Sequence, residues 1–64
     1  MENRLRTLRR TRGMTQQQLA DTAEVSRQTV IAIEAGRFNP SVLLAFRLAK
    51  ALGVTIEDIF IFEG

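Results

Sequence analysis

Residues 15–36 read TQQQLADTAEVSRQTVIAIEAG and contain two helix starts with a short connection between them. Thr15, followed three positions later by Gln18, forms the capping-box pattern, in which the hydroxyl and the amide each satisfy a free backbone group. Ser26 is a second favourable N-cap residue, so only the three residues AEV separate the two helices. The stretch therefore predicts one helix over residues 16–23 and another that begins just after Ser26, which is a helix-turn-helix arrangement.

The rest of the sequence predicts three further helices. The first has its apolar residues on one face and ends at Gly13. The Asn-Pro pair at 39–40 precedes a helix whose leucines are spaced four apart, and Thr55 is an N-cap for a short last helix. These leucines are Leu44, Leu48 and Leu52. The predicted fold class is therefore all-α, with five helices in a single domain over residues 1–64.

The composition excludes several classes of function. A chain of 64 residues buries only about 60% of the surface that its unfolded form exposes, so tight packing or self-association must add stability. The sequence has no Cys, His or Tyr and no glycine-rich phosphate loop, which argues against an enzyme and against a metal or cofactor site. No small-molecule ligand is indicated. No apolar run approaches the roughly 18 residues of a membrane span, and no signal segment is evident, so we expect a cytoplasmic protein.

Charge is distributed unevenly along the sequence. Residues 1–50 contain all nine Lys and Arg residues and four acids, a net charge of +5. Residues 51–64 contain three acids and no cation, a net charge of −3. Eight of the nine cations are Arg, whose planar guanidinium group matches phosphates and guanine edges. This pattern favours a nucleic-acid partner, although a solvated helix face would carry the same charges.

Three motifs are distinctive: TQQQLA, VSRQTV and NPS. Together with the flanking RLRTLRRTRGMTQ and ALGVTIEDIF, they resemble the Cro and phage-repressor type of helix-turn-helix regulator, also called the xenobiotic-response-element family. The resemblance covers essentially the whole chain and implies a five-helix, lambda-repressor-like DNA-binding domain, with the helix-turn-helix at about residues 15–35. Glu24 stands where many family members have glycine in the turn, so a positive φ there would cost strain.

The resemblance also implies which residues contact double-stranded DNA. Arg27 and Gln28 are expected to contact base edges, with Gln17 close enough to touch DNA or to brace Gln28. Ile31 and Ala32 replace residues that are often polar in the family, and they can offer no more than an apolar contact to a thymine methyl group. Six residues are expected to face the phosphate backbone and fix the register: Thr15, Gln16, Ser26, Thr29, Arg37 and Asn39.

In the family pattern, a Glu at the position of Glu34 pairs with an Arg of the first helix, which here is Arg9. We expect a structural ion pair. A catalytic role for Glu34 would need a second reacting group and a pocket, and neither is evident.

The apolar chain end, IEDIFIFEG, carries more apolar atoms than a 64-residue monomer can hide. We expect a homodimer whose interface lies at about residues 55–64 and includes Ile59, Phe60 and Phe62. This segment either continues the last helix or forms a short C-terminal strand. The alternative for Phe60 is a place in the core of its own chain.

Two functions follow from these observations. The first is a homodimeric transcriptional regulator that reads an inverted-repeat operator with two recognition helices about 34 Å apart. Of repression and activation, we expect repression. The second is a protein-interaction module, such as an antitoxin or adaptor, that uses the apolar C-terminal tail.

Overall fold

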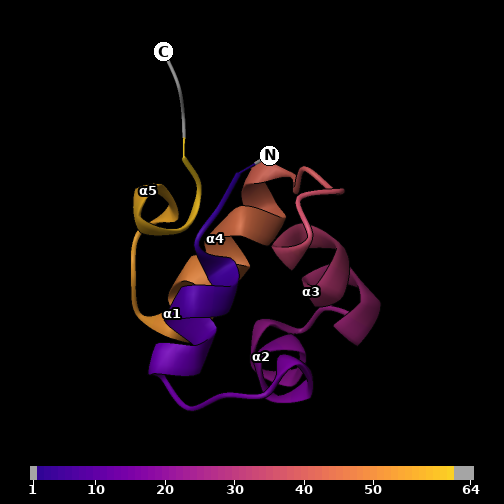
Figure 1. The fold of residues 1–64 in the computed structure, drawn as a ribbon, viewed down its shortest axis with the longest axis vertical. Coiled ribbons are helices and arrows are strands. Elements are labelled where there is room, and N and C mark those ends of the chain that lie inside the picture. The colour runs from indigo at the N-terminus through magenta and orange to yellow at the C-terminus, as the bar shows by residue number, and fades with distance from the viewer. Residues whose placement is uncertain (1, 62–64) are drawn as a thin grey trace.

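The computed structural model describes residues 2–61, and these contain five α-helices (Figure 1). The helices are α1 (Leu5–Thr11), α2 (Gln16–Ala23), α3 (Arg27–Glu34), α4 (Val42–Leu52) and α5 (Ile56–Ile59). The predicted all-α class and the predicted bounds of the first motif helix are confirmed. None of the helices in residues 2–61 is long and apolar enough to cross a membrane.

Four of the helices begin at a residue whose hydroxyl accepts a hydrogen bond from a backbone N–H of the first turn. These residues are Thr15, Ser26, Ser41 and Thr55. Gln18 and Asp58 complete capping boxes at the starts of α2 and α5. The hydrogen bond from the backbone N–H of Thr55 is the main reason that the pKa of Asp58 lies below its ordinary value. Local hydrogen bonding therefore explains where these helices start.

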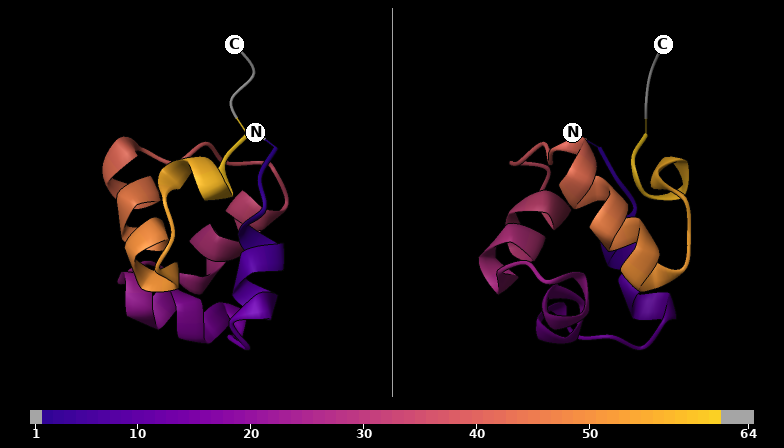
Figure 2. Two further views of the ribbon diagram at one scale, coloured as in Figure 1. Left: turned by 90° about the vertical axis from the view of Figure 1, so that its left-hand side faces the viewer. Right: turned by 180° about the vertical axis from the view of Figure 1, so that it is seen from behind.

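The core lies where all five helices meet, with α2 across one end of the molecule (Figure 2). Each helix contributes at least one large side chain with no exposed surface: Leu5, Leu19, Val30, Ile33, Leu48 and Ile59. Ala20, also fully buried, lies on α2, which packs against α3. A small side chain at this position lets the two helices of the motif approach closely, as the resemblance implied.

The turn between α2 and α3 passes through a left-handed backbone conformation. Glu24 has φ 59° and ψ 46°, and it has the only positive φ of a non-glycine residue in the described chain. Its N–H donates to the carbonyls of Ala20 and Asp21, which ends α2. A left-handed conformation is costly for a residue with a Cβ atom, so the strain expected at this position is present.

The two ends of the described chain pair with each other. An isolated antiparallel bridge joins Asn3 to Phe60, and the N–H of Arg4 donates to the carbonyl of Ile59 at 2.7 Å. The N–H of Ile61 donates to the carbonyl of Glu2 at 3.2 Å. The expected C-terminal strand is therefore not found within residues 2–61, because the segment after α5 makes only this bridge, with its own chain.

The residues expected at the dimer interface need a correction. Ile59 is 0% exposed and Phe60 is 2% exposed within a single chain, so neither can contact a partner without leaving the core. This placement is the alternative that we considered for Phe60. Phe62, the third expected interface residue, lies outside the described residues.

Candidate nucleic-acid interface

Arg27 and Gln28 begin α3, directly after the turn that follows α2 (Figure 1). Both side chains are exposed. Within residues 2–61, neither side chain forms a hydrogen bond or an ion pair. Their donors and acceptors are therefore available to an external partner, in the first turn of the helix that the resemblance identifies as the recognition helix.

The start of α2 presents two glutamines with different surroundings. Gln16 is half-buried, and its Nε2 donates to Oε1 of Glu34 at 3.2 Å. Gln17 is exposed, and its Nε2 donates to Oδ1 of Asp21, one turn along the same helix, at 2.8 Å. In this arrangement Gln17 is held by Asp21 and does not brace Gln28.

Two of the residues expected to face the DNA backbone, Thr15 and Ser26, also cap helices, and a third, Thr29, bonds to the second cap. The Thr15 hydroxyl accepts from the N–H of Gln18 at 3.0 Å. The Ser26 hydroxyl accepts from the N–H of Thr29 at 3.1 Å, and the two hydroxyl oxygens lie 2.7 Å apart. Because a hydroxyl can both accept and donate, capping by Thr15 leaves its hydrogen available to a phosphate oxygen.

Arg37 and Asn39 lie in the segment that joins α3 to α4. Both side chains are exposed, and neither forms a hydrogen bond or an ion pair in the described part of the chain. A cation and an amide in this state can reach a phosphate group without first breaking an internal contact.

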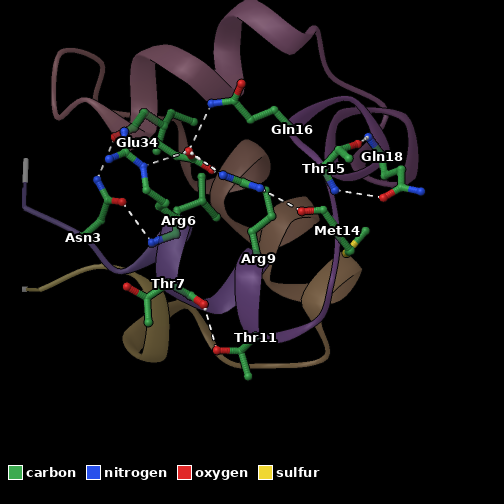
Figure 3. A network of polar contacts seen from close by, with 12 residues as sticks. Asn3, Arg6, Thr7, Arg9, Thr11, Met14, Thr15, Gln16, Gln18 and Glu34 are labelled. Carbon is green, nitrogen blue, oxygen red and sulfur yellow. Dashed lines mark hydrogen bonds and ion pairs between the residues drawn. The ribbon is translucent and has the colours of Figure 1, made fainter.

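A buried carboxylate ties α1, α2 and α3 together (Figure 3). Arg9 donates from Nε to Oε2 of Glu34 at 2.7 Å and from Nη2 to Oε1 at 3.3 Å. Its Nη1 donates to the carbonyl of Met14 at 2.8 Å. Gln16 and Arg6 also donate to Oε1 of Glu34, at 3.2 and 3.4 Å. The two residues that the resemblance paired are therefore in contact, within a larger network.

The surroundings of Glu34 favour its charged form. Burial alone raises the pKa of this carboxyl group, but the hydrogen bonds from Arg9, Gln16 and Arg6 and the charge of Arg9 outweigh it and hold the pKa below its ordinary value. The Glu34 side chain is 0% exposed and that of Arg9 is 9% exposed. The arrangement is that of a structural ion pair.

Most arginines near the amino terminus are bound within the chain. Arg4, Arg6, Arg9 and Arg12 each donate to an acceptor on another element. Arg10 is exposed, and its side chain has no internal partner within the described residues. The positive charge of this segment is therefore largely engaged in contacts within the chain, whereas the exposed side chains of Arg27 and Arg37 have no internal partner in the described residues.

Two contacts at the end of α3 were not predicted. Asn3 donates from Nδ2 to the carbonyl of Ile33 at 2.8 Å, and this carbonyl near the end of α3 also accepts from the N–H of Gly36 at 2.9 Å. Gln16 reaches Glu34 from the start of α2. Both contacts join residues far apart in the sequence, and no spacing rule connects such positions.

Comparisons with known proteins identify the family of this chain. The helix-turn-helix family profile matches residues 5–59. A helix-turn-helix-type transcriptional regulator of Methanocaldococcus jannaschii is 54% identical over 63 residues, which cover 98% of this chain and 96% of that protein. The immunity repressor protein of Bacillus phage phi105 is 39% identical over 56 residues, which cover 88% of this chain and 39% of the repressor.

A solved structure has the same fold. The restriction-modification controller protein C.AhdI from Aeromonas hydrophila matches with a TM-score of 0.84 and 35% sequence identity, over 89% of this chain and 86% of that chain. The chain therefore belongs to the helix-turn-helix family and is a DNA-binding transcriptional regulator of the Cro and phage-repressor type.

Proposed function

We propose that this regulator binds an inverted-repeat operator as a homodimer and acts as a cytoplasmic repressor. The observation that carries the proposal is the exposure of Arg27 and Gln28, without internal partners in residues 2–61, on the first turn of α3. An Arg can pair bidentately with guanine and a Gln with adenine, and each good pair contributes about 1–3 kcal/mol of discrimination. Occupancy of a promoter by such a dimer would block polymerase.

Residues around this pair would fix the position of the protein on the duplex. The hydroxyls of Thr15, Ser26 and Thr29 lie at the starts of α2 and α3, where free N–H groups also favour phosphate. Arg37 and Asn39 extend this set beyond α3. Gln16 is engaged by Glu34. Gln17 bonds to Asp21 through one N–H, which leaves its second N–H and its Oε1 for a base edge.

The alternative of a protein-interaction module that docks through the C-terminal tail has less support. Such a module would need accessible apolar side chains at the end of α5 and beyond it, whereas Ile59 and Phe60 lie in the core. The helix-turn-helix surface, in contrast, exposes Arg27 and Gln28.

The experiment is selection of DNA sequences from a random pool at near-physiological salt. We expect the unmodified chain to enrich an inverted repeat, and we expect Arg27→Ala and Gln28→Ala to lose preference at defined positions in each half-site. Arg10→Ala is the matched control, because it removes an exposed arginine from α1 and should leave the selected sequence unchanged. If all four proteins select the same sequence with the same preference at every position, α3 does not read the bases.

Salt dependence separates contacts to phosphates from contacts to bases. The logarithm of the affinity should fall with the logarithm of the salt concentration, with a slope of about 0.9 per phosphate neutralised. Arg37→Ala should reduce this slope by about 0.9 without changing the selected sequence. A changed sequence preference would instead assign Arg37 to the bases.

A further inference from the structure

The outward face of α4 carries large apolar side chains that the fold leaves uncovered. Val42, Leu43 and Phe46 are 82%, 60% and 55% exposed, and Phe38, in the segment before the helix, is 43% exposed. On a helix, Val42 and Leu43 are neighbours of Phe46, at spacings of four and three residues. A contiguous apolar patch of this kind marks an interaction site.

Phe46 lies between two hollows in the surface. One hollow, of about 480 Å³, lies between α4 and the carboxyl end of α2, and Leu43 also lines it. The other, of about 490 Å³, lies between α4 and the start of α5 and is lined by Val54 and Ile56. A large ring beside an apolar hollow is self-complementary, because the ring of one copy can fill the hollow of another.

The charges around Phe46 have the same self-complementary arrangement. Arg47 and Glu24 line the hollow beside α2, Glu57 lines the hollow beside α5, and Lys50 lines both. In a two-fold symmetric dimer, both subunits use the same patch. A residue at one edge of the patch on one copy therefore faces a residue at the opposite edge of the patch on the other copy. Arg47 of each copy can then face Glu57 of the other, which adds charge complementarity to the apolar contact.

The α4 face can be covered while the DNA-binding residues stay accessible. When the molecule is seen from behind, α4 lies in front of α1 (Figure 2, right). None of the residues expected to contact DNA lines either hollow. An interface of standard size buries about 800 Å² per subunit, which is roughly one fifth of the 4179 Å² surface of this chain.

We propose that a second copy of this chain docks on the outward face of α4, with Phe46 of each copy seated in the hollow beside α5 of the other. This inference rests on the proposed homodimer, and it replaces Ile59 and Phe60 as the residues that hold the dimer. Contacts between Arg47 of one copy and Glu57 of the other set the orientation of the two copies.

The test is sedimentation analysis of the full chain over a range of protein concentrations. Phe46→Glu should weaken dimerisation at least about 30-fold, because it places a charge in the centre of the interface. Thr7→Glu is the matched control, since it adds the same charge at an exposed position on α1 and should leave the dimer intact. Circular dichroism verifies that each variant keeps its helices.

A charge exchange gives a positive test of the orientation. Arg47→Glu alone should weaken the dimer, and the double variant Arg47→Glu with Glu57→Arg should restore part of the lost affinity. The chain contains no cysteine, so Phe46→Cys can also be tested with a short bis-maleimide, with Thr7→Cys as its control. Efficient cross-linking of the first variant but not the second is the expected result.

The outcomes separate this inference from the proposed function. If the unmodified chain is a dimer and Phe46→Glu is a dimer of the same affinity, the α4 interface is wrong and the homodimer stands. If the unmodified chain is a monomer at every concentration, the homodimer itself is wrong, and the interface with it. DNA selection with the same proteins then shows whether a single copy reads a half-site.

Discussion

Removing Glu34 should destabilise this protein more than any exposed substitution. The Glu34 side chain is 0% exposed, and Arg9, its closest partner, is 9% exposed and 2.7 Å away. In Glu34→Ala the Arg9 guanidinium keeps only its bond to the Met14 carbonyl and becomes an uncompensated buried charge. Breaking a buried pair in this way costs about 3–5 kcal/mol.

That loss is large for so small a chain. At roughly 0.05–0.15 kcal/mol per residue, a chain of 64 residues has a free energy of unfolding of about 3–10 kcal/mol. Glu34→Ala should therefore remove a large fraction of it. With a shift of about 4–8 °C per kcal/mol for domains of this size, the melting temperature should fall by more than about 12 °C.

Arg6 provides a matched comparison, because it binds the same carboxylate. Its Nε lies 3.4 Å from Oε1 of Glu34, but its side chain is 53% exposed. An exposed ion pair contributes about 0–1 kcal/mol, so Arg6→Ala should have a small effect. The double variant Arg9→Met with Glu34→Leu removes both buried charges and should recover most of the stability that Glu34→Ala loses.

The assay is urea denaturation followed by far-UV circular dichroism, at one protein concentration for all variants. The reasoning is refuted if Glu34→Ala and Arg6→Ala lose the same free energy of unfolding within about 0.5 kcal/mol. It is also refuted if the double variant is less stable than Glu34→Ala, because the penalty would then not come from an unpaired charge.

Two further predictions concern acid stability and the turn. The pKa of Glu34 is lowered in the folded chain, so its contribution is complete above the ordinary carboxyl pKa and is lost as the pH falls through the lowered one. Acid titrations of unfolding should therefore show a steeper loss for the unmodified chain than for Glu34→Gln, and parallel curves would contradict this. Glu24→Gly should stabilise the chain by up to about 1 kcal/mol by relieving the left-handed strain. Glu24→Val should lower the melting temperature, and the opposite order would show that the turn is not strained.

The helices and their starts could be read from the sequence because their causes are local. Thr15 and Gln18 form the capping box that their spacing predicts, and α2 begins and ends where expected. Arg27 and Gln28 were placed at the start of α3 by the neighbouring cap at Ser26. In each case the hydrogen bonds join residues within about one helical turn, so the order of the residues is sufficient information.

The network around Glu34 was only partly predictable. The family resemblance paired Glu34 with Arg9, but composition and spacing alone could not. Gln16 was expected to face DNA, and its contact with Glu34 depends on how α2 crosses α3. Helix crossing is set by the shapes of packed side chains far apart in the chain, which no local pattern records.

The sequence by itself determined the number of helices, the caps at Thr15, Ser26 and Thr55 and the position of the helix-turn-helix. Only the tertiary structure decided which apolar side chains are buried. Phe60 is 2% exposed and Phe46 is 55% exposed, although both stand in apolar stretches of sequence. The physical reason is that capping and helix formation act over a few residues, whereas burial depends on which distant elements pack against a given face.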